Sequence, residues 1–247
     1  MTSLEGLIEG YRRFRAEVFP RQQAFFSALA TAQNPTAMFI TCADSRVVPD
    51  LITQCGPGDL FVCRNVGNIV PPYAQFTGGV SAAIEYAVMA LGVRHIIVCG
   101  HSDCGAMKAT LDPKSTERMA AVSAWLRHAQ IAKHVVDENY HTHDEHELLD
   151  ALTQENVVAQ LDHLRTHPSV AAKLAKGELG LHGWIYDIES ANIRAFCGER
   201  GRFVDLEEAS FVPHATPPAR LGIGMASAMN GRIRPLPSAV VKSDAAD

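Results

Sequence analysis

The sequence has little excess charge of either sign and no long uninterrupted apolar run. Its 22 lysines and arginines stand against 27 aspartates and glutamates, which gives a formal net charge of −5 at pH 7. Nucleic acids and anionic membranes select basic surfaces, so we expect neither as a partner. The most apolar window, residues 79–100, is interrupted by Glu85, Arg94 and His95. It therefore predicts a buried helix and a buried strand and not a membrane span.

The start of the chain also lacks the apolar core of a secretory signal. Residues 1–15 contain no contiguous apolar stretch, so we expect a cytoplasmic protein in a reducing compartment. The six cysteines then indicate metal binding or catalysis more than disulfides. Cys104 has no cysteine three residues before it, which argues against a thiol redox function.

Short apolar segments alternate with helical patterns along the chain. Strands are predicted at residues 37–41, 59–63, 94–99, 181–188 and 193–196. Helices are predicted at residues 4–18, 22–32, 80–91, 119–132 and 148–167. This alternation predicts an α/β fold, a single domain with a mainly parallel central sheet flanked by helices.

The two ends of the chain differ from this central pattern. Residues 4–18 are amphipathic and precede the first strand, so they predict an N-terminal helical arm that packs on its own core or on a second subunit. We expect the domain, with this arm, to span residues 1–212. Residues 213–247 are rich in Pro, Gly, Ala and Ser and predict a C-terminal extension whose last residues are disordered.

Two motifs at predicted strand ends carry side chains that can bind a metal. GHSDCGA at residues 100–106 supplies His101 and Cys104, and Cys42 directly follows the strand at 37–41. In open α/β sheets, ligands gather beyond the carboxyl ends of strands where the strand order reverses, so we expect the two motifs to meet. Two cysteines and a histidine are a catalytic ligand set for one Zn²⁺ per chain, with the fourth position open.

Asp44 and Arg46 follow Cys42 by two and four residues. They can form a charge-assisted pair in which Arg46 keeps Asp44 ionised and oriented. Asp44 can then accept a hydrogen bond from a zinc-bound water and orient it as a nucleophile. If the pair breaks, Asp44 can become the fourth zinc ligand and close the site. Asp103, in contrast, is expected to cap the helix that begins near Gly105.

A second group of metal-type side chains lies in HTHDEHE at residues 141–147. Its spacing matches no fixed coordination geometry. We interpret it as a solvated loop between helices.

The motifs CADSR (42–46) and GHSDCGA (100–106) resemble those of the β-class carbonic anhydrases. Three further segments are similar to this family: FVCRNVGNIVPP (61–72), AAIEYAV (82–88) and LHGWIYDIES (181–190). The resemblance covers residues 1–212 and looks closest to bacterial enzymes found beside cyanate-degrading genes. It implies reversible hydration of carbon dioxide to bicarbonate and a proton by a zinc-bound hydroxide, with Asp44 and Arg46 orienting the nucleophile. It also implies a homodimer or homotetramer, because some pocket residues in this family come from the neighbouring subunit.

Within the family the chain looks most similar to the plant-like branch, whose zinc site is constitutively open. The resemblance implies a substrate pocket made by Gln33, Phe61, Val66, Tyr86 and Gly105. Its apolar side chains suit CO₂, and the glutamine and the glycine N–H can donate to bicarbonate oxygens.

The other branch, which bicarbonate closes, has a tryptophan where this chain has Phe39. A phenylalanine cannot donate the indole hydrogen bond, so the open branch is favoured.

Two alternatives remain open. The same zinc site could act on another heterocumulene, such as CS₂ or COS. The chain could also be a non-catalytic protein with a structural zinc closed by Asp44. The motifs do not distinguish these alternatives from CO₂ hydration.

Overall fold

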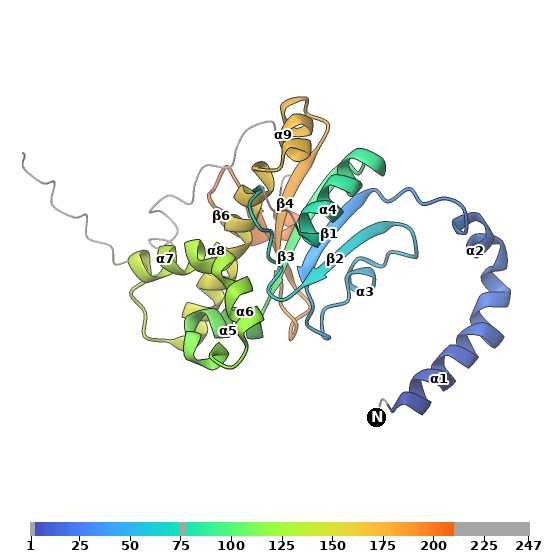
Figure 1. Cartoon of the computed structure of the whole chain (residues 1–247), viewed down its shortest axis with the longest axis horizontal. Helices are drawn as coiled ribbons and strands as arrows, with labels where there is room; N and C mark the ends of the chain where they lie inside the picture. Colours follow the sequence, from blue (N-terminus) through green and yellow to red (C-terminus); the bar gives the residue numbers. More distant parts are fainter. Residues whose placement is uncertain (1–2, 75–77, 210–247) are drawn as a thin grey trace, which may run out of the picture.

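The centre of the molecule is a six-stranded sheet (Figure 1). The computed structural model describes residues 3–74 and 78–209. The strands are β1 (Ala37–Cys42), β2 (Leu60–Asn65), β3 (His95–His101), β4 (Gly180–Tyr186), β5 (Ile193–Cys197) and β6 (Arg202–Asp205). Their order is β2-β1-β3-β4-β5-β6; the first four are parallel to one another, and β5 is antiparallel to both of its neighbours, β4 and β6. The predicted mainly parallel sheet is confirmed, with β6 as an unpredicted edge strand, whereas the expected extension at 213–247 lies outside the described residues.

Strand β1 is central because every one of its residues is apolar or can satisfy its own polar group. All six residues of AMFITC are buried, and the Thr41 hydroxyl donates to the Cys99 carbonyl at 2.9 Å. Strand β2 pairs with one edge of β1 and β3 with the other. The chain therefore turns to opposite sides of β1 in successive crossovers, which places a strand-order reversal between β1 and β3.

Helices cover the sheet and connect its strands. They are α3 (Pro49–Thr53), α4 (Gly79–Glu85), α5 (Gly105–Leu111), α6 (Ala120–Leu126), α7 (Gln130–Asn139), α8 (Glu145–Arg165) and α9 (Pro168–Ala175). A π-helical turn, η3 (Tyr86–Ala90), continues α4. The predicted helix at 119–132 is in fact divided between α6 and α7 by a 3-10 turn, η5 (Arg127–Ala129). Among the described helices, none is long and apolar enough to cross a membrane.

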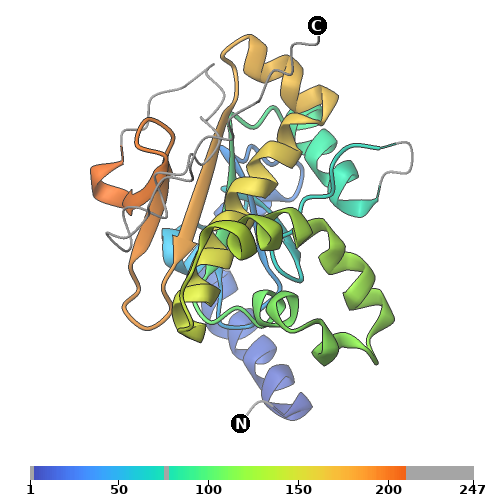
Figure 2. The same cartoon turned by 90° about the vertical axis from the view of Figure 1, so that its left-hand side faces the viewer.

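Helix α8 is the longest helix in contact with the sheet, and it packs on β3 and β4 (Figure 2). It begins three residues before its predicted start, because the Asp144 carboxylate accepts hydrogen bonds from the N–H groups of His146 and Glu147 at 2.8 and 3.1 Å. This capping uses part of the histidine-rich run, so residues 141–144 form the expected loop and 145–147 form the first helical turn.

The N-terminal arm comprises α1 (Leu4–Arg13), the π-helical η1 (Phe14–Val18), the 3-10 turn η2 (Phe19–Gln22) and α2 (Gln23–Leu29). Ser3 caps α1 by accepting from the Gly6 N–H at 3.1 Å. None of these four elements has a buried residue, and the arm extends away from the sheet (Figure 1). The predicted helical arm is therefore present, and within one chain its apolar side chains remain exposed.

Candidate metal centre

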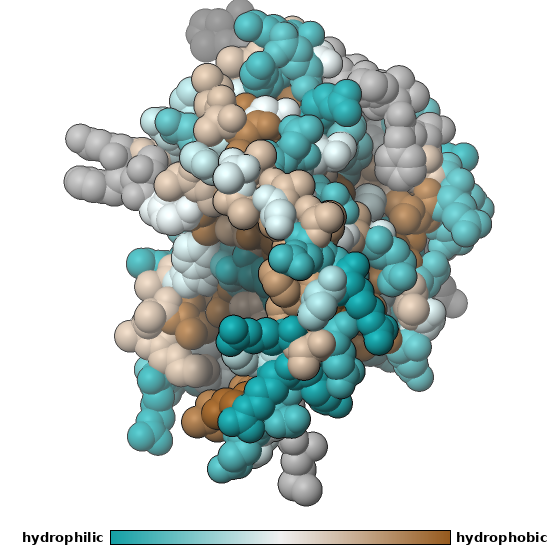
Figure 3. Space-filling view, turned by 90° about the vertical axis from the view of Figure 1, so that its right-hand side faces the viewer, coloured by the Kyte–Doolittle hydropathy of each residue, from teal (hydrophilic) through white to brown (hydrophobic). Residues whose placement is uncertain are grey.

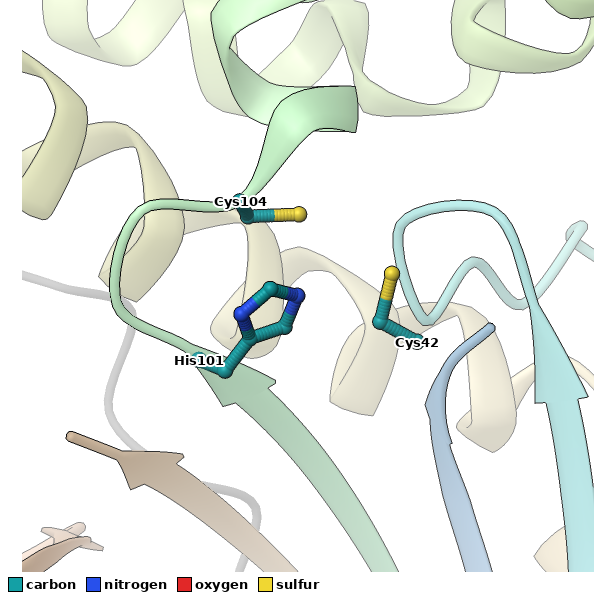
Figure 4. Close-up of side chains that lie close together, drawn as sticks. All are labelled: Cys42, His101 and Cys104. Carbon is teal, nitrogen blue, oxygen red and sulfur yellow. The ribbon is translucent and has the colours of Figure 1, made fainter. Parts of the chain in front are cut away.

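Three side chains from three different elements point toward one another at the carboxyl ends of the strands (Figure 4). Cys42 is the last residue of β1, His101 is the last residue of β3, and Cys104 immediately precedes α5. Their ligand atoms all lie within 4.8 Å of one another, and all three residues are buried. The pairing of β1 with β3 brings the two sequence motifs together, as the strand-end argument predicts.

His101 makes the hydrogen bond that orients a metal-binding imidazole. Its Nδ1 lies 2.8 Å from the Ser102 carbonyl oxygen, which can only accept, so Nδ1 carries the proton. The lone pair is then on Nε2, and this buried atom has no hydrogen-bond partner among the described residues. Because a buried polar atom without a partner is costly, the arrangement fits a cation at this position.

The thiols of Cys42 and Cys104 shift each other's pKa in opposite directions. The hydrogen bond from Cys104 is the main cause that lowers the pKa of Cys42 to about 4; burial opposes it, and His101 and the Gly67 N–H contribute in the same direction as Cys104. The same hydrogen bond and burial raise the pKa of Cys104 well above its ordinary value. A divalent cation would favour the thiolate form at both sulfurs.

A tight loop after β2 supplies the backbone donor to Cys42. The Gly67 N–H lies 3.4 Å from the Cys42 sulfur. Gly67 has φ +83°, and a Cβ atom there would lie 3.0 Å from the Ala106 Cβ. Glycine is therefore required both by the left-handed backbone and by the close approach to α5.

Asp44 and Arg46 form the predicted ion pair beside this centre. The Arg46 Nε donates to Asp44 Oδ1 at 3.0 Å, and Nη2 donates to Oδ2 at 2.8 Å. This bidentate contact holds the pKa of Asp44 well below its usual range. Asp44 Oδ2 lies 3.8 Å from His101 Nε2, so the carboxylate stands next to the ligand set.

Arg64 fixes the backbone that carries Asp44. Its Nε donates to the Cys42 carbonyl at 3.2 Å, and its Nη2 donates to the Asp44 carbonyl at 2.6 Å. The sequence gives no reason to expect a guanidinium bound to two carbonyls, because the contacts depend on the register of β1 with β2.

The prediction that Asp103 caps α5 is wrong. Cys104 occupies the N-cap position, and the helix has no side-chain cap. Asp103 instead adopts φ +56°, and its carboxylate makes ion pairs with Arg46 and Lys108. The left-handed backbone turns this side chain away from the first N–H groups of the helix and toward the Asp44–Arg46 pair.

The five predicted pocket residues lie in two places. Val66 and Gly105 adjoin Gly67 and Cys104 at the metal centre. In contrast, Phe61 pairs with Met38 on β1, four residues before Cys42, a separation of about 13 Å along the strand.

The remaining pocket residues, Tyr86 and Gln33, lie near Phe61 and before the start of β1, respectively. The ring centroid of Tyr86 is 6.0 Å from that of Phe61. Gln33 is exposed and precedes the start of β1. One chain therefore does not bring Gln33, Phe61 and Tyr86 to its own metal centre.

Two buried amides of α8 also contribute to the site, and sequence reasoning did not identify them. The Asn156 Nδ2 donates to the Gly67 carbonyl at 3.1 Å, and Gln160 Oε1 accepts from the Val70 N–H at 2.8 Å. The Gln160 Nε2 also donates to Asn156 Oδ1 at 2.9 Å. These bonds hold residues 67–70, and a pair of amide residues four apart on one helix is the only sequence signal for them.

The amino-acid sequence is similar to a protein-family model and to individual proteins of known family. Residues 37–193 match a family model described as carbonic anhydrase. A carbonic anhydrase from Pseudomonas aeruginosa is 52% identical over 205 residues, which cover 83% of this chain and 93% of that protein. Carbonic anhydrase 1 of Escherichia coli O157:H7 is 51% identical over 203 residues, covering 82% of this chain and 92% of that protein.

The fold is also similar to solved structures of β-carbonic anhydrases. The β-carbonic anhydrase CcaA has a TM-score of 0.81 at 43% identity, over 85% of this chain and 93% of that one. A structure from a study of two tetrameric β-carbonic anhydrases of Sordaria macrospora has a TM-score of 0.70 at 31% identity, over 78% of this chain and 95% of that one.

Proposed function

The chain belongs to the β-class carbonic anhydrases, and we propose that it converts carbon dioxide reversibly to bicarbonate and a proton at the centre formed by Cys42, His101 and Cys104. One observation carries the proposal: the buried, unpartnered Nε2 of His101 faces two thiols, with the Asp44 carboxylate 3.8 Å away. This combines a cation site with an anchored carboxylate, which a purely structural site would not need.

Zn²⁺ is the cation that this donor set favours. Two thiolates and a neutral imidazole are its usual ligands, whereas Mg²⁺ and Ca²⁺ prefer oxygen. When bound, zinc acidifies a water molecule and so supplies a nucleophile near neutral pH. We propose one Zn²⁺ per chain, held by Cys42, His101 and Cys104.

Asp44 orients the nucleophile, and Arg46 orients Asp44. An ionised carboxylate can only accept a hydrogen bond, so Asp44 Oδ2 accepts one from the attacking water and directs a lone pair of that water at the carbon of CO₂. Arg46 fixes the carboxylate through two parallel bonds of 3.0 and 2.8 Å. Val66 supplies an apolar wall, and the Gly105 N–H donates to an oxygen of the forming bicarbonate.

We propose that the pocket is completed by a second copy of the chain in a homodimer, which can pair further into a homotetramer. Phe61 lies about 13 Å along the strand direction from the level of Cys42, Tyr86 packs beside Phe61, and Gln33 precedes β1. A partner chain would bring a second set of these residues to the metal centre. The tetrameric state of the Sordaria macrospora proteins agrees with such an assembly.

The helical arm provides the surface for this assembly. Leu4, Leu7 and Tyr11 are 72%, 60% and 59% exposed. The face of the molecule on the side of the arm also carries hydrophobic residues in several separate places among hydrophilic ones (Figure 3). The contiguous apolar face of α1, and not these scattered residues, is the feature typical of a protein–protein contact.

We also propose that residues 1–212 form the catalytic unit and that the enzyme acts in the cytoplasm. The six cysteines are all free thiols, which suits a reducing compartment.

Metal analysis combined with stopped-flow CO₂ hydration tests the function. We expect about one zinc per chain and hydration activity, both lost in Cys42→Ser because the hard hydroxyl is a poor substitute for a thiolate ligand. Cys55→Ser is the matched control, since the Cys55 thiol donates to the Thr53 carbonyl at 3.8 Å and is not one of the three clustered ligands. A zinc-loaded wild type without hydration between pH 6.5 and 9 would refute the proposal.

A further inference from the structure

Arg46 is held from two sides, and only one of them is Asp44. Its Nη1 donates to Asp103 Oδ2 at 3.2 Å, and its Nη2 donates to the Asp103 backbone carbonyl at 3.2 Å. Lys108 forms an ion pair with the other carboxylate oxygen, Asp103 Oδ1. The guanidinium therefore bridges two carboxylates, one beside the metal centre and one on the loop between His101 and Cys104.

The second contact matters because the Asp44–Arg46 pair is open to solvent. The Arg46 side chain is 44% exposed, so water competes for its donors and a single exposed ion pair is weak. Asp103 ties the guanidinium to the same loop that carries two of the three metal ligands. Arg46 then presents its Nε and Nη2 edge toward Asp44 at a fixed place relative to that centre.

The Asp44 carboxylate has a competing position within its reach. Its Oδ2 is 3.8 Å from the unpartnered His101 Nε2, so a small rotation would bring it onto a cation held there. A carboxylate at that position would fill the coordination site that a nucleophilic water needs. Whether Asp44 remains with Arg46 depends on how firmly Arg46 is held.

We propose that Asp103 is a positioning residue: by anchoring Arg46, it keeps Asp44 paired and off the metal, so that the fourth coordination position stays open. The inference rests on the proposed function, because it assigns a cause to the orientation of Asp44. The contacts of the Asp103 carboxylate are with Arg46 and Lys108, so it acts on Asp44 through Arg46.

Asp103→Asn is the variant that tests this role. Asparagine keeps the size of the side chain and tolerates the left-handed backbone at φ +56°, but it loses the charge that holds Arg46. Asp137→Asn is the matched control, because Asp137 loses the same charge from an exposed ion pair with Lys133 on α7. Each protein is loaded with Co²⁺, azide is titrated by visible absorbance, and the zinc form is assayed for CO₂ hydration.

In Asp103→Asn we expect azide affinity and kcat to fall by the same factor, about three- to fivefold. Both require the state in which Asp44 is paired, so a common factor identifies that state. Asp137→Asn should match the wild type in both measurements. Unchanged azide affinity in Asp103→Asn, or a fall in kcat alone, would overturn the proposal.

A crystal structure of zinc-loaded Asp103→Asn separates this proposal from the proposed function. We expect loss of the Arg46–Asp44 contacts and the Asp44 carboxylate on the metal in part of the molecules. Full retention of both contacts would overturn the role of Asp103 even if the enzyme hydrates CO₂. An inactive wild type would refute the function while the crystal structure still decides the role of Asp103.

Discussion

At the scale of single residues, Gly67 combines a left-handed backbone conformation with a direct contact to the metal centre. Its N–H donates to the Cys42 sulfur, and the space for a side chain is closed by Ala106. Gly67→Ala should therefore destabilise the fold by about 1–2 kcal/mol through the left-handed backbone, and it should also weaken zinc binding about tenfold, because the N–H moves away from the thiolate. Thermal unfolding and competition with a chromophoric chelator measure the two effects.

Gly177→Ala is the control for this experiment. Gly177 has φ +68° and nothing within 4 Å of an added Cβ atom. It should lose similar stability but keep its zinc affinity. If both variants bind zinc as the wild type does, the Gly67 N–H does not contribute to the centre.

Glu155 is a buried carboxyl group that the proposed mechanism does not use. Burial raises its pKa from 4.5 to about 7, although the hydrogen bond from the Tyr140 hydroxyl, 2.9 Å long, opposes the shift. Because the folded state binds the proton more tightly than the unfolded state, this group favours folding below about pH 4.5. That contribution is lost as the pH rises through 7.

Glu155→Gln should therefore be more stable than the wild type at pH 8, by a difference on the order of 2 kcal/mol, and similar to it near pH 5. Urea unfolding at both pH values measures this difference. Glu138→Gln, on the exposed face of α7, should show no such pH-dependent gain. An equal gain at both pH values would mean that the ionisation of Glu155 is not responsible.

The residue scale also shows what the sequence can and cannot predict. Cys42, His101 and Cys104 could be predicted to meet, because each follows a recognisable strand and the ligand types form a zinc set. Asp103 could not be assigned, because its partner depends on a left-handed backbone angle, and aspartate before a helix more often caps it. The capping preference of aspartate therefore predicted the wrong role for Asp103, because contacts within the site determine its backbone conformation.

At the scale of elements, α8 supports the loop that carries Gly67. Asn156→Leu would leave the Gly67 carbonyl and the Gln160 amide without their partners, which costs about 1–3 kcal/mol. We expect lower stability together with weaker zinc binding, measured by urea unfolding and by chelator competition.

Gln154→Leu is the control on the same helix, since Gln154 is also buried and donates to Asp150 at 2.8 Å, away from the loop. It should lose stability but not zinc affinity. Equal zinc affinity in the two variants would show that α8 supports the fold only.

The elements themselves were largely predictable. Strands β1 to β5 were predicted because short apolar runs mark buried strands. The break between α6 and α7 was not predicted, because the apolar spacing at 119–132 continues across the 3-10 turn. Helical periodicity alone does not reveal such a turn.

At the scale of the whole molecule, the arm is a helical segment with an apolar face that its own chain leaves exposed. Helix α1 has a polar face, which includes Glu5, Glu9 and Arg12, and an apolar face, which includes Leu4, Leu7 and Tyr11. An isolated helix of ten residues is marginal in water. Contact of the apolar face with a second copy would stabilise the helix and bury its apolar area in the same step.

Replacing Leu4, Leu7 and Tyr11 together by serine should therefore shift the protein toward a 26.8 kDa monomer in sedimentation velocity. CO₂ hydration should fall as the oligomer dissociates, because Gln33, Phe61 and Tyr86 of the second copy leave the pocket. The zinc content should stay at one per chain, because the three ligands belong to one chain. Replacing Glu5, Glu9 and Arg12 by serine changes the polar face of the same helix by the same number of residues and should leave the assembly intact. A monomer that retains full activity would show that each chain completes its own pocket. An unchanged oligomer after replacement of Leu4, Leu7 and Tyr11 would show that the apolar face of the arm is not the interface.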